Sequence, residues 1–300
     1  MEPWPHMVMA GGDGGPRRPW WRRPRSLALG AVVAGLVVGL GAVLVERQPE
    51  TNQPVVASVP VLLQAADEPG PDPFTGSVAS SSAGPSGSPS GGPPLAVASA
   101  STVGSRSVDG GTAGLYGGTE RLGSCEVAKL TDYLVGHVDK AHAWAGVEGV
   151  RVGDIPFYLG RLTPVVLRSD TRVTNHGFAD GLATGFQSVL RAGTAVLIDN
   201  RGLPRVRCAC GNPLLPPAVP SGPVTFTGPA WPGFRVDELV TVVPAGAPVT
   251  AFVIRDRSRG SWFSRPVGGS GGDDQPVPSP RPSASGSPSA TETPAGQRGS

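Results

Sequence analysis

The chain has 300 residues, of which 44 are Gly and 34 are Pro, and only 16% are charged. This share of glycine and proline is typical of chains in which a large part forms no packed core. The formal net charge of +2 excludes a strongly basic chain, so the composition predicts no nucleic-acid partner.

The most pronounced local feature is the apolar run at residues 27–45, LALGAVVAGLVVGLGAVLV, which contains no charge. As a helix it would be about 28 Å long, close to the roughly 30 Å hydrocarbon core of a bilayer. Positively charged flanks stay on the cytoplasmic side of a membrane, and five arginines precede the run: Arg17, Arg18, Arg22, Arg23 and Arg25. We therefore expect residues 1–26 to be cytoplasmic, 27–45 to form a single transmembrane helix in the lipid bilayer, and the bulk of the chain to be extracytoplasmic.

A cleaved signal peptide is the alternative interpretation of this run. Such peptides have a shorter apolar core and a cleavage site of small residues close to its end. The nearest candidate site, Val56-Ala57-Ser58, lies well beyond residue 45, so we favour an uncleaved anchor. Gly35 and Gly39 form a GxxxG spacing that lets two helices approach closely. This spacing predicts a weak homodimer through the membrane segment.

Composition divides the remainder of the chain. Residues 46–112 and 268–300 are rich in Pro, Ser, Gly and Ala and have few large apolar residues to offset the entropy cost of ordering. We expect a flexible stalk and a disordered tail there. Residues 113–267 contain all three cysteines and most of the aromatic residues, and a segment of this length can form one domain with its own core.

Within this domain, helical patterns come first. Ser124 is a good N-cap, and apolar residues recur after it at steps of three or four from Val127 to Ala141. Pro156 favours a second, short helix from Asp154 to about Arg161. Strand-forming segments follow, at residues 164–168, 171–174, 194–199, 204–208, 224–227, 239–243 and 249–255. This order predicts an α+β domain with N-terminal helices and a mainly antiparallel sheet.

The cysteines are Cys125, Cys208 and Cys210, and thiols outside the cytoplasm tend to form disulfides. Cys125 begins the first predicted helix, while the other two follow the predicted hairpin. Residues two apart on a strand share a face. Either Cys208 or Cys210 can therefore pair with Cys125, which leaves one spare thiol.

Two sharper hypotheses use the same part of the chain. A zinc site could combine the Cys-x-Cys with His176 or Cys125, but structural zinc sites usually need wider spacing and a second ligand pair. A nucleophilic cysteine could act with His176 and with Asp170 or Asp199, although His176 also fits an ordinary turn. The sequence contains no P-loop, HExxH or G-x-S-x-G motif. We expect no metal and no cofactor, and His176 and Asp170 are the catalytic candidates.

Four segments carry a family resemblance: EPGPDPFTG at 68–76, GLYGGT at 114–119, LTPVVLRSDTRVTNHGF at 162–178 and GTAVLIDNRGLPRVRCACGNPL at 193–214. They resemble an actinomycete-type family of membrane-anchored or exported proteins with a domain of unknown function. The resemblance spans about residues 68–255. It implies one exported domain and carries over no catalytic residues.

Phe74 is a lone aromatic residue in the predicted stalk. We expect its segment to dock onto the domain, by adding a strand or filling a pocket; the alternative is an exposed linker residue. The layout predicts a membrane-anchored structural or interaction module of the cell envelope, with an envelope protein or cell-wall component as partner. The alternative is a hydrolase-like envelope enzyme that uses His176 with Asp170 or a free cysteine.

Overall fold

The computed structural model describes residues 58–81 and 105–280 of the chain. The predicted transmembrane helix at 27–45, with Gly35 and Gly39, lies outside these ranges. Within them, no helix is long and apolar enough to cross a membrane.

The predicted α+β class with N-terminal helices is wrong. The described residues form a strand-rich domain with one 14-stranded sheet. Three strands, β1 (Val59–Gln64), β2 (Arg106–Asp109) and β3 (Tyr116–Gly118), precede the first helix. Apolar periodicity could not reveal these strands, because β1 and β2 lie in the Pro- and Ser-rich region and find their partners far away in sequence.

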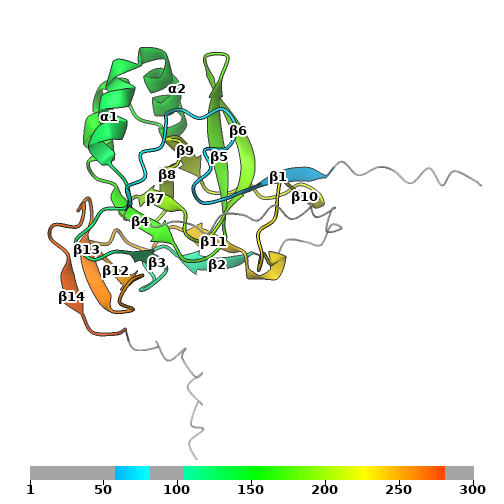
Figure 1. Ribbon diagram of the computed structural model, residues 1–300. Coiled ribbons are helices and arrows are strands. Elements are labelled where there is room, and N and C mark those ends of the chain that lie inside the picture. The colour runs from blue at the N-terminus through cyan, green and yellow to red at the C-terminus, as the bar shows by residue number, and fades with distance from the viewer. Residues whose placement is uncertain (1–57, 82–104, 281–300) are drawn as a thin grey trace, which may run out of the picture. The chain divides into compact units, whose positions relative to one another are not determined.

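The later strands complete the sheet (Figure 1). They are β4 (Thr163–Leu167), β5 (Thr171–Ala179), β6 (Leu182–Leu190), β7 (Ala195–Ile198), β8 (Pro204–Arg207), β9 (Asn212–Leu215), β10 (Val224–Thr227), β11 (Val240–Val243), β12 (Ala251–Asp256), β13 (Trp262–Pro266) and β14 (Gln275–Val277). The main path runs β10-β1-β6-β5-β9-β8-β7-β4-β3-β12-β13-β14, and β11 joins β5 to β2. The expected antiparallel sheet is in fact mixed, since β1–β10, β1–β6, β2–β11, β5–β11 and β3–β12 pair in parallel.

Three helices lie together at one end of the domain: α1 (Val127–Gly136), α2 (Val138–Glu148) and α3 (Ile155–Leu159). Figure 1 shows α1 and α2 beside the long β5–β6 hairpin and β9. The single helix expected to run to about Trp144 is interrupted at His137, whose backbone leaves the helical region (φ −129°). Gly149 ends α2 in the left-handed conformation (φ 68°), which glycine adopts without steric cost.

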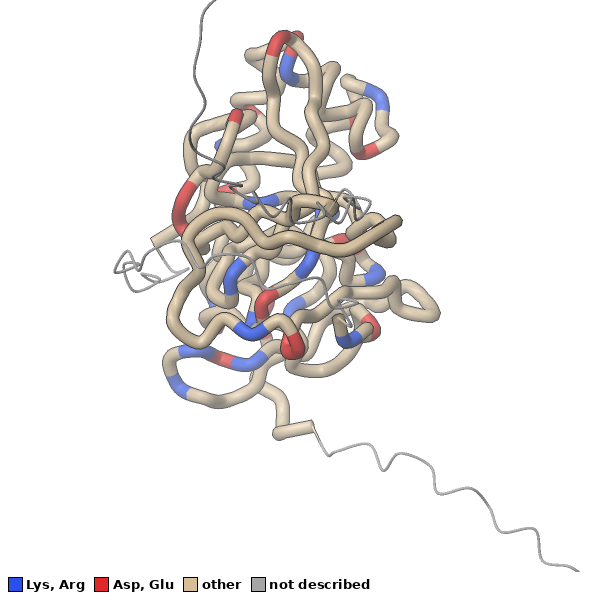
Figure 2. The backbone as a smooth tube through the Cα atoms, turned by 90° about the vertical axis from the view of Figure 1, so that its right-hand side faces the viewer, with Lys and Arg blue, Asp and Glu red and all other residues tan. Residues whose placement is uncertain are grey.

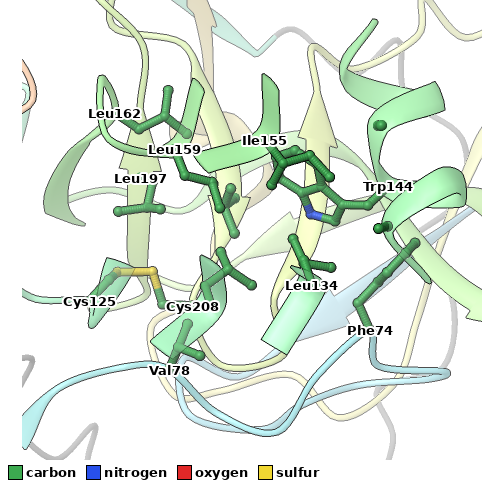
Figure 3. Packing of buried hydrophobic residues seen from close by; sticks show 14 of the residues in the cluster. Phe74, Val78, Cys125, Leu134, Trp144, Ile155, Leu159, Leu162, Leu197 and Cys208 are labelled. Atoms are coloured by element: carbon green, nitrogen blue, oxygen red, sulfur yellow. A yellow bond between two sulfur atoms is a disulfide. The ribbon is translucent and has the colours of Figure 1, made fainter. Parts of the chain in front are cut away.

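The main core lies under these helices (Figure 3). Leu130 and Leu134 of α1, Trp144 of α2, and Ile155 and Leu159 of α3 are all buried there. The same core contains residues from the start of the described chain and the sulfur atoms near β8. It therefore joins parts of the sequence that composition alone assigns to different regions.

The described domain extends beyond the expected limits of 113–267. We call residues 58–81 the N-terminal segment; it contributes β1 to the sheet and places Phe74 in the main core with none of its surface exposed. At the other end, β14 (Gln275–Val277) pairs with β13. Both additions come from sequence dominated by small residues and proline, in which hydrogen bonds to distant strands supply the order that local pattern does not.

Candidate functional site

The two catalytic candidates lie in different places. His176, on β5, lines an open groove between α2 and the β5–β6 hairpin, together with His142 and Leu182. Asp170 lines another pocket beside Trp231. Its carboxylate accepts hydrogen bonds from the Ala192 amide at 2.8 Å and from the Trp231 indole at 2.9 Å. The structure therefore does not bring His176 and Asp170 together as an acid–base pair.

The His176 ring is half-buried, and its Nδ1 lies 3.3 Å from the carbonyl oxygen of Pro213. A carbonyl can only accept, so this contact assigns the ring proton to Nδ1. Burial lowers the pKa of His176, which favours the neutral ring. This is the environment of a hydrogen-bonded strand residue, in contrast to the turn position that the sequence suggested.

The predicted disulfide is confirmed, and it joins Cys125 to Cys208 with their Cα atoms 5.9 Å apart (Figure 3). Cys210 is the free thiol and is completely buried. Burial raises the pKa of this thiol, which disfavours the nucleophilic thiolate. Across residues 58–81 and 105–280, no three His, Cys, Asp or Glu side chains are grouped to hold a metal ion.

A different site stands out where the end of α2, helix α3 and the β7–β8 hairpin meet. It is a pocket of about 560 Å³, and we call it the Glu148 pocket. Six charged side chains line it, three acidic and three basic: Glu148, Asp154, Asp199, Arg151, Arg161 and Arg205. Phe157, Tyr158 and Asn200 also contribute to the wall. Concave sites of this size that mix apolar and polar side chains are typical of small-molecule binding.

Local packing decides which α3 side chains face the pocket. Ile155 and Leu159, four residues apart, are buried on one face of the helix. This leaves Phe157 on the outside, with 68% of its surface exposed. Tyr158 points back toward the end of α2, where its hydroxyl donates a hydrogen bond to Glu148 Oε2 at 2.5 Å.

The Glu148 carboxyl is the most perturbed acid of the pocket. Its side chain is fully covered, and burial raises its pKa to about 7 although the Tyr158 hydrogen bond and the Arg205 charge oppose this. An acid with this pKa is partly protonated at neutral pH, and such groups are common at functional sites. Because no part of the Glu148 side chain is exposed, however, a ligand in the pocket contacts the residues around Glu148 and not the carboxyl itself.

Arg205 and Asp199 form the ordered floor of the pocket. Arg205 Nε donates to Asp199 Oδ2 at 2.8 Å. The other carboxylate oxygen, Oδ1, accepts the backbone N–H groups of Arg201 at 2.9 Å and Leu203 at 3.0 Å. Asp199 therefore ties the hairpin turn to the Arg205 guanidinium and fixes the direction in which that group points.

The rim of the pocket is exposed and cationic in part. Arg151 forms an ion pair with Asp154 at 2.7 Å. The Arg161 guanidinium lies 5.4 Å from the centre of the Phe157 ring, a cation–π contact between two residues that line the pocket. The arrangement provides cations, hydrogen-bonding groups and one aromatic surface, which together suit the binding of a polar ligand.

Sequence reasoning missed this pocket. Its key residues, Glu148, Tyr158 and Arg205, come from three separate elements, and no motif spacing links them. The available signal was weak: a short predicted helix with two adjacent aromatic residues, and a hairpin turn that begins with Asp199.

Fold and site together define a strand-rich domain that is stapled by one disulfide and contains a small polar pocket. Residues 106–268 match the family described as a domain of unknown function (DUF6777), and the chain belongs to this family. The matched residues include the whole Glu148 pocket, whereas the N-terminal segment precedes them. No curated protein and no solved structure matches the chain.

Proposed function

We propose that the chain is an extracytoplasmic interaction module of the cell envelope, which acts by binding a ligand in the Glu148 pocket. One observation carries the proposal. The group suited to acid–base chemistry, Glu148, has no exposed surface, while binding side chains such as Arg151 and Phe157 are open to solvent. A site arranged in this way holds a ligand without presenting a catalytic group to it.

The location is part of the proposal. The apolar run at 27–45 with its arginine flank supports attachment to the cell membrane, with the N-terminus cytoplasmic and the domain outside. The Cys125–Cys208 disulfide supports an oxidising compartment. The partners would then be the lipid bilayer and an envelope protein or cell-wall component. Weak self-association through Gly35 and Gly39 stays a prediction.

Topology can be tested on the full chain with an epitope tag at its C-terminus. We expect protease added to intact spheroplasts to remove the tag, and alkaline carbonate to leave the untreated chain in the membrane fraction. A tag that is digested only after the membrane is lysed would contradict the proposed location.

Binding can be tested by thermal unfolding of the full chain in detergent, with a soluble digest of cell-envelope glycans and peptides. At a ligand concentration near 100 Kd, binding adds about 3 kcal/mol, equivalent to a rise in Tm of roughly 6–12 °C for a domain of this size. We expect Arg205→Gln to abolish this rise. The matched control is Arg235→Gln, since Arg235 is exposed and forms ion pairs with Asp237 and Glu238. An equal rise in wild type and Arg205→Gln would exclude this pocket as the binding site.

A further inference from the structure

We infer that the Glu148 pocket binds a sugar acid, with the Arg205 guanidinium contacting its carboxylate. The inference rests on the proposed binding function and names the chemical class of the ligand. Three features of the pocket support this ligand class. They are the hydrogen-bond donors of Arg205, the balance between acidic and basic side chains, and the presence of both polar and aromatic residues in the rest of the lining.

The Arg205 guanidinium has hydrogen-bond donors that are available to a ligand. In the described part of the chain, the Arg205 guanidinium donates one hydrogen bond, from Nε to Asp199. Its Nη1 lies 3.9 Å from Glu148 Oε2, which is too far for a hydrogen bond. The Asp199 contact holds the group in one orientation, so the two terminal nitrogens form a preoriented fork at the pocket wall. A planar fork of this kind matches a carboxylate, which it can bind through two parallel hydrogen bonds.

The charges around the fork favour an anion. Arg205 forms ion pairs with Asp199 and, through Nη1, with Glu148 when that carboxyl is ionised, and Arg151 pairs with Asp154. Arg161 packs over the Phe157 ring, and among the described residues no carboxylate pairs with it. The pocket therefore has one cation in excess whenever Glu148 is protonated. Figure 2 shows acidic and basic residues interspersed along the described part of the chain.

The rest of the lining suits a carbohydrate ring. Asn200 and Asp154 line the pocket and offer amide and carboxylate groups that can hydrogen-bond hydroxyls. Phe157 offers an exposed aromatic surface for the apolar face of a ring. The volume of about 560 Å³ accommodates a monosaccharide with room for a second unit. A ligand with a carboxylate at one end and a polyol ring beside it uses all these groups at once.

The decisive comparison is between D-glucuronate and D-glucose, which share a ring and differ in one carboxylate. Isothermal titration calorimetry of the full chain in detergent should show glucuronate binding at least about tenfold more tightly than glucose, because a charge-assisted hydrogen-bond pair contributes on that scale. Arg205→Gln should weaken glucuronate binding by roughly tenfold to a hundredfold. The Arg235→Gln control should bind as the wild type does.

Arg161→Gln is the second variant, because Arg205 also supports the hairpin turn and its loss could perturb folding. Arg161 lies at the rim, so this variant should fold normally but bind glucuronate several-fold more weakly than the wild type does.

Unchanged glucuronate affinity in both folded variants would overturn the inference, as would equal affinity for glucose or stronger binding of inorganic phosphate. If glucuronate does not bind but the envelope digest still shifts the Tm through Arg205, the sugar-acid assignment fails and the binding function stands. If neither ligand acts through Arg205, both fail.

Discussion

Burial raises the pKa of Glu148 from its usual value of 4.5 to about 7. The folded chain therefore keeps a proton that the unfolded chain releases between these pH values. The associated stability is fully present below the unfolded pKa and is lost as the pH rises through 7. We predict that Glu148→Gln raises the free energy of unfolding at about pH 8.5 by on the order of 2 kcal/mol, with little effect near pH 4. Urea unfolding at the two pH values measures this.

Tyr158→Phe is the matched control for this prediction. It removes the hydroxyl that donates to Glu148, a hydrogen bond that favours the ionised carboxyl. The loss of stability with rising pH should then begin near the same unfolded pKa, continue to a higher pH and reach a larger final value, because the pKa of Glu148 in the folded chain rises further. A Glu148→Gln protein whose stability depends on pH as the wild type does would show that another group controls this range.

Asp256 contributes stability with the opposite dependence on pH from Glu148. Burial alone would raise its pKa, but the carboxylate accepts hydrogen bonds from the amides of Glu120, Ser258 and Arg259 and from the Ser258 hydroxyl, and these lower the pKa to about 2. The resulting stability is present above the unfolded pKa of 3.8 and is lost as the pH falls toward 2. We predict that Asp256→Asn costs about 1–3 kcal/mol at neutral pH. Thermal unfolding should show this difference shrinking near pH 2; a constant difference would contradict the assignment.

At the scale of elements, the N-terminal segment is held by contacts with several strands. Buried Arg207 of β8 donates to the carbonyl oxygens of Ala65, Glu68 and Pro69. Phe74 fills the main core, with its ring 5.3 Å from that of Phe178, and its amide donates to Asn212 Oδ1 at 3.0 Å. The segment precedes the residues that match the family, yet it forms part of the same packed domain.

We predict that Phe74→Ala lowers the free energy of unfolding by about 3–5 kcal/mol, as other buried phenylalanines do. The variant should also make residues 58–81 cleavable by low concentrations of protease. Phe157→Ala is the control, because that ring is 68% exposed and its removal should cost less than about 0.5 kcal/mol. Phe74→Ala with unchanged stability and unchanged protease sensitivity would show that the segment does not support the domain.

Local pattern predicted several strands that follow the helices, including β10 and β11, whose strand partners lie far away in sequence. The hairpin expected at 194–199 and 204–208 corresponds to β7 and β8, which pair with each other. By contrast, β1 pairs with β6 and β10, both more than 100 residues away. Its partners, and not its own composition, decide that it is a strand. The β5–β6 hairpin was predicted only at its start, since Gly177, Gly181 and Gly185 break the apolar alternation.

The disulfide and the Glu148 pocket were also hard to predict, because their residues are distant in sequence. Cys125 could be assigned to a disulfide because its expected compartment and its residue type restrict the choice, but only the geometry selects Cys208 over Cys210. The Glu148 pocket is assembled from three elements that no motif connects. The pKa of Glu148 depends on Tyr158 and Arg205, which are neighbours in the fold alone.

For the whole molecule, the disulfide lies where the three parts of the domain meet. It links the start of α1 to the end of β8, and its two half-cystines are 83 residues apart. The N-terminal segment runs between them: the Val78 amide donates to Cys208 O at 2.8 Å, and the Glu126 amide donates to Val78 O at 2.8 Å. One covalent bond therefore restrains helices, sheet and N-terminal segment together.

We predict that a Cys125→Ser, Cys208→Ser double variant loses about 4 kcal/mol of stability, because the unfolded chain regains the entropy of a loop of some 80 residues. Thermal unfolding of oxidised, reduced and variant protein measures this, and the reduced wild type should unfold close to the variant. Cys210→Ala is the control, since it removes a buried thiol while it leaves the cross-link in place; its Tm should still fall on reduction. If the wild type has the same Tm with and without reductant, the disulfide does not contribute to stability, and packing of core residues such as Phe74 and Trp144 is sufficient.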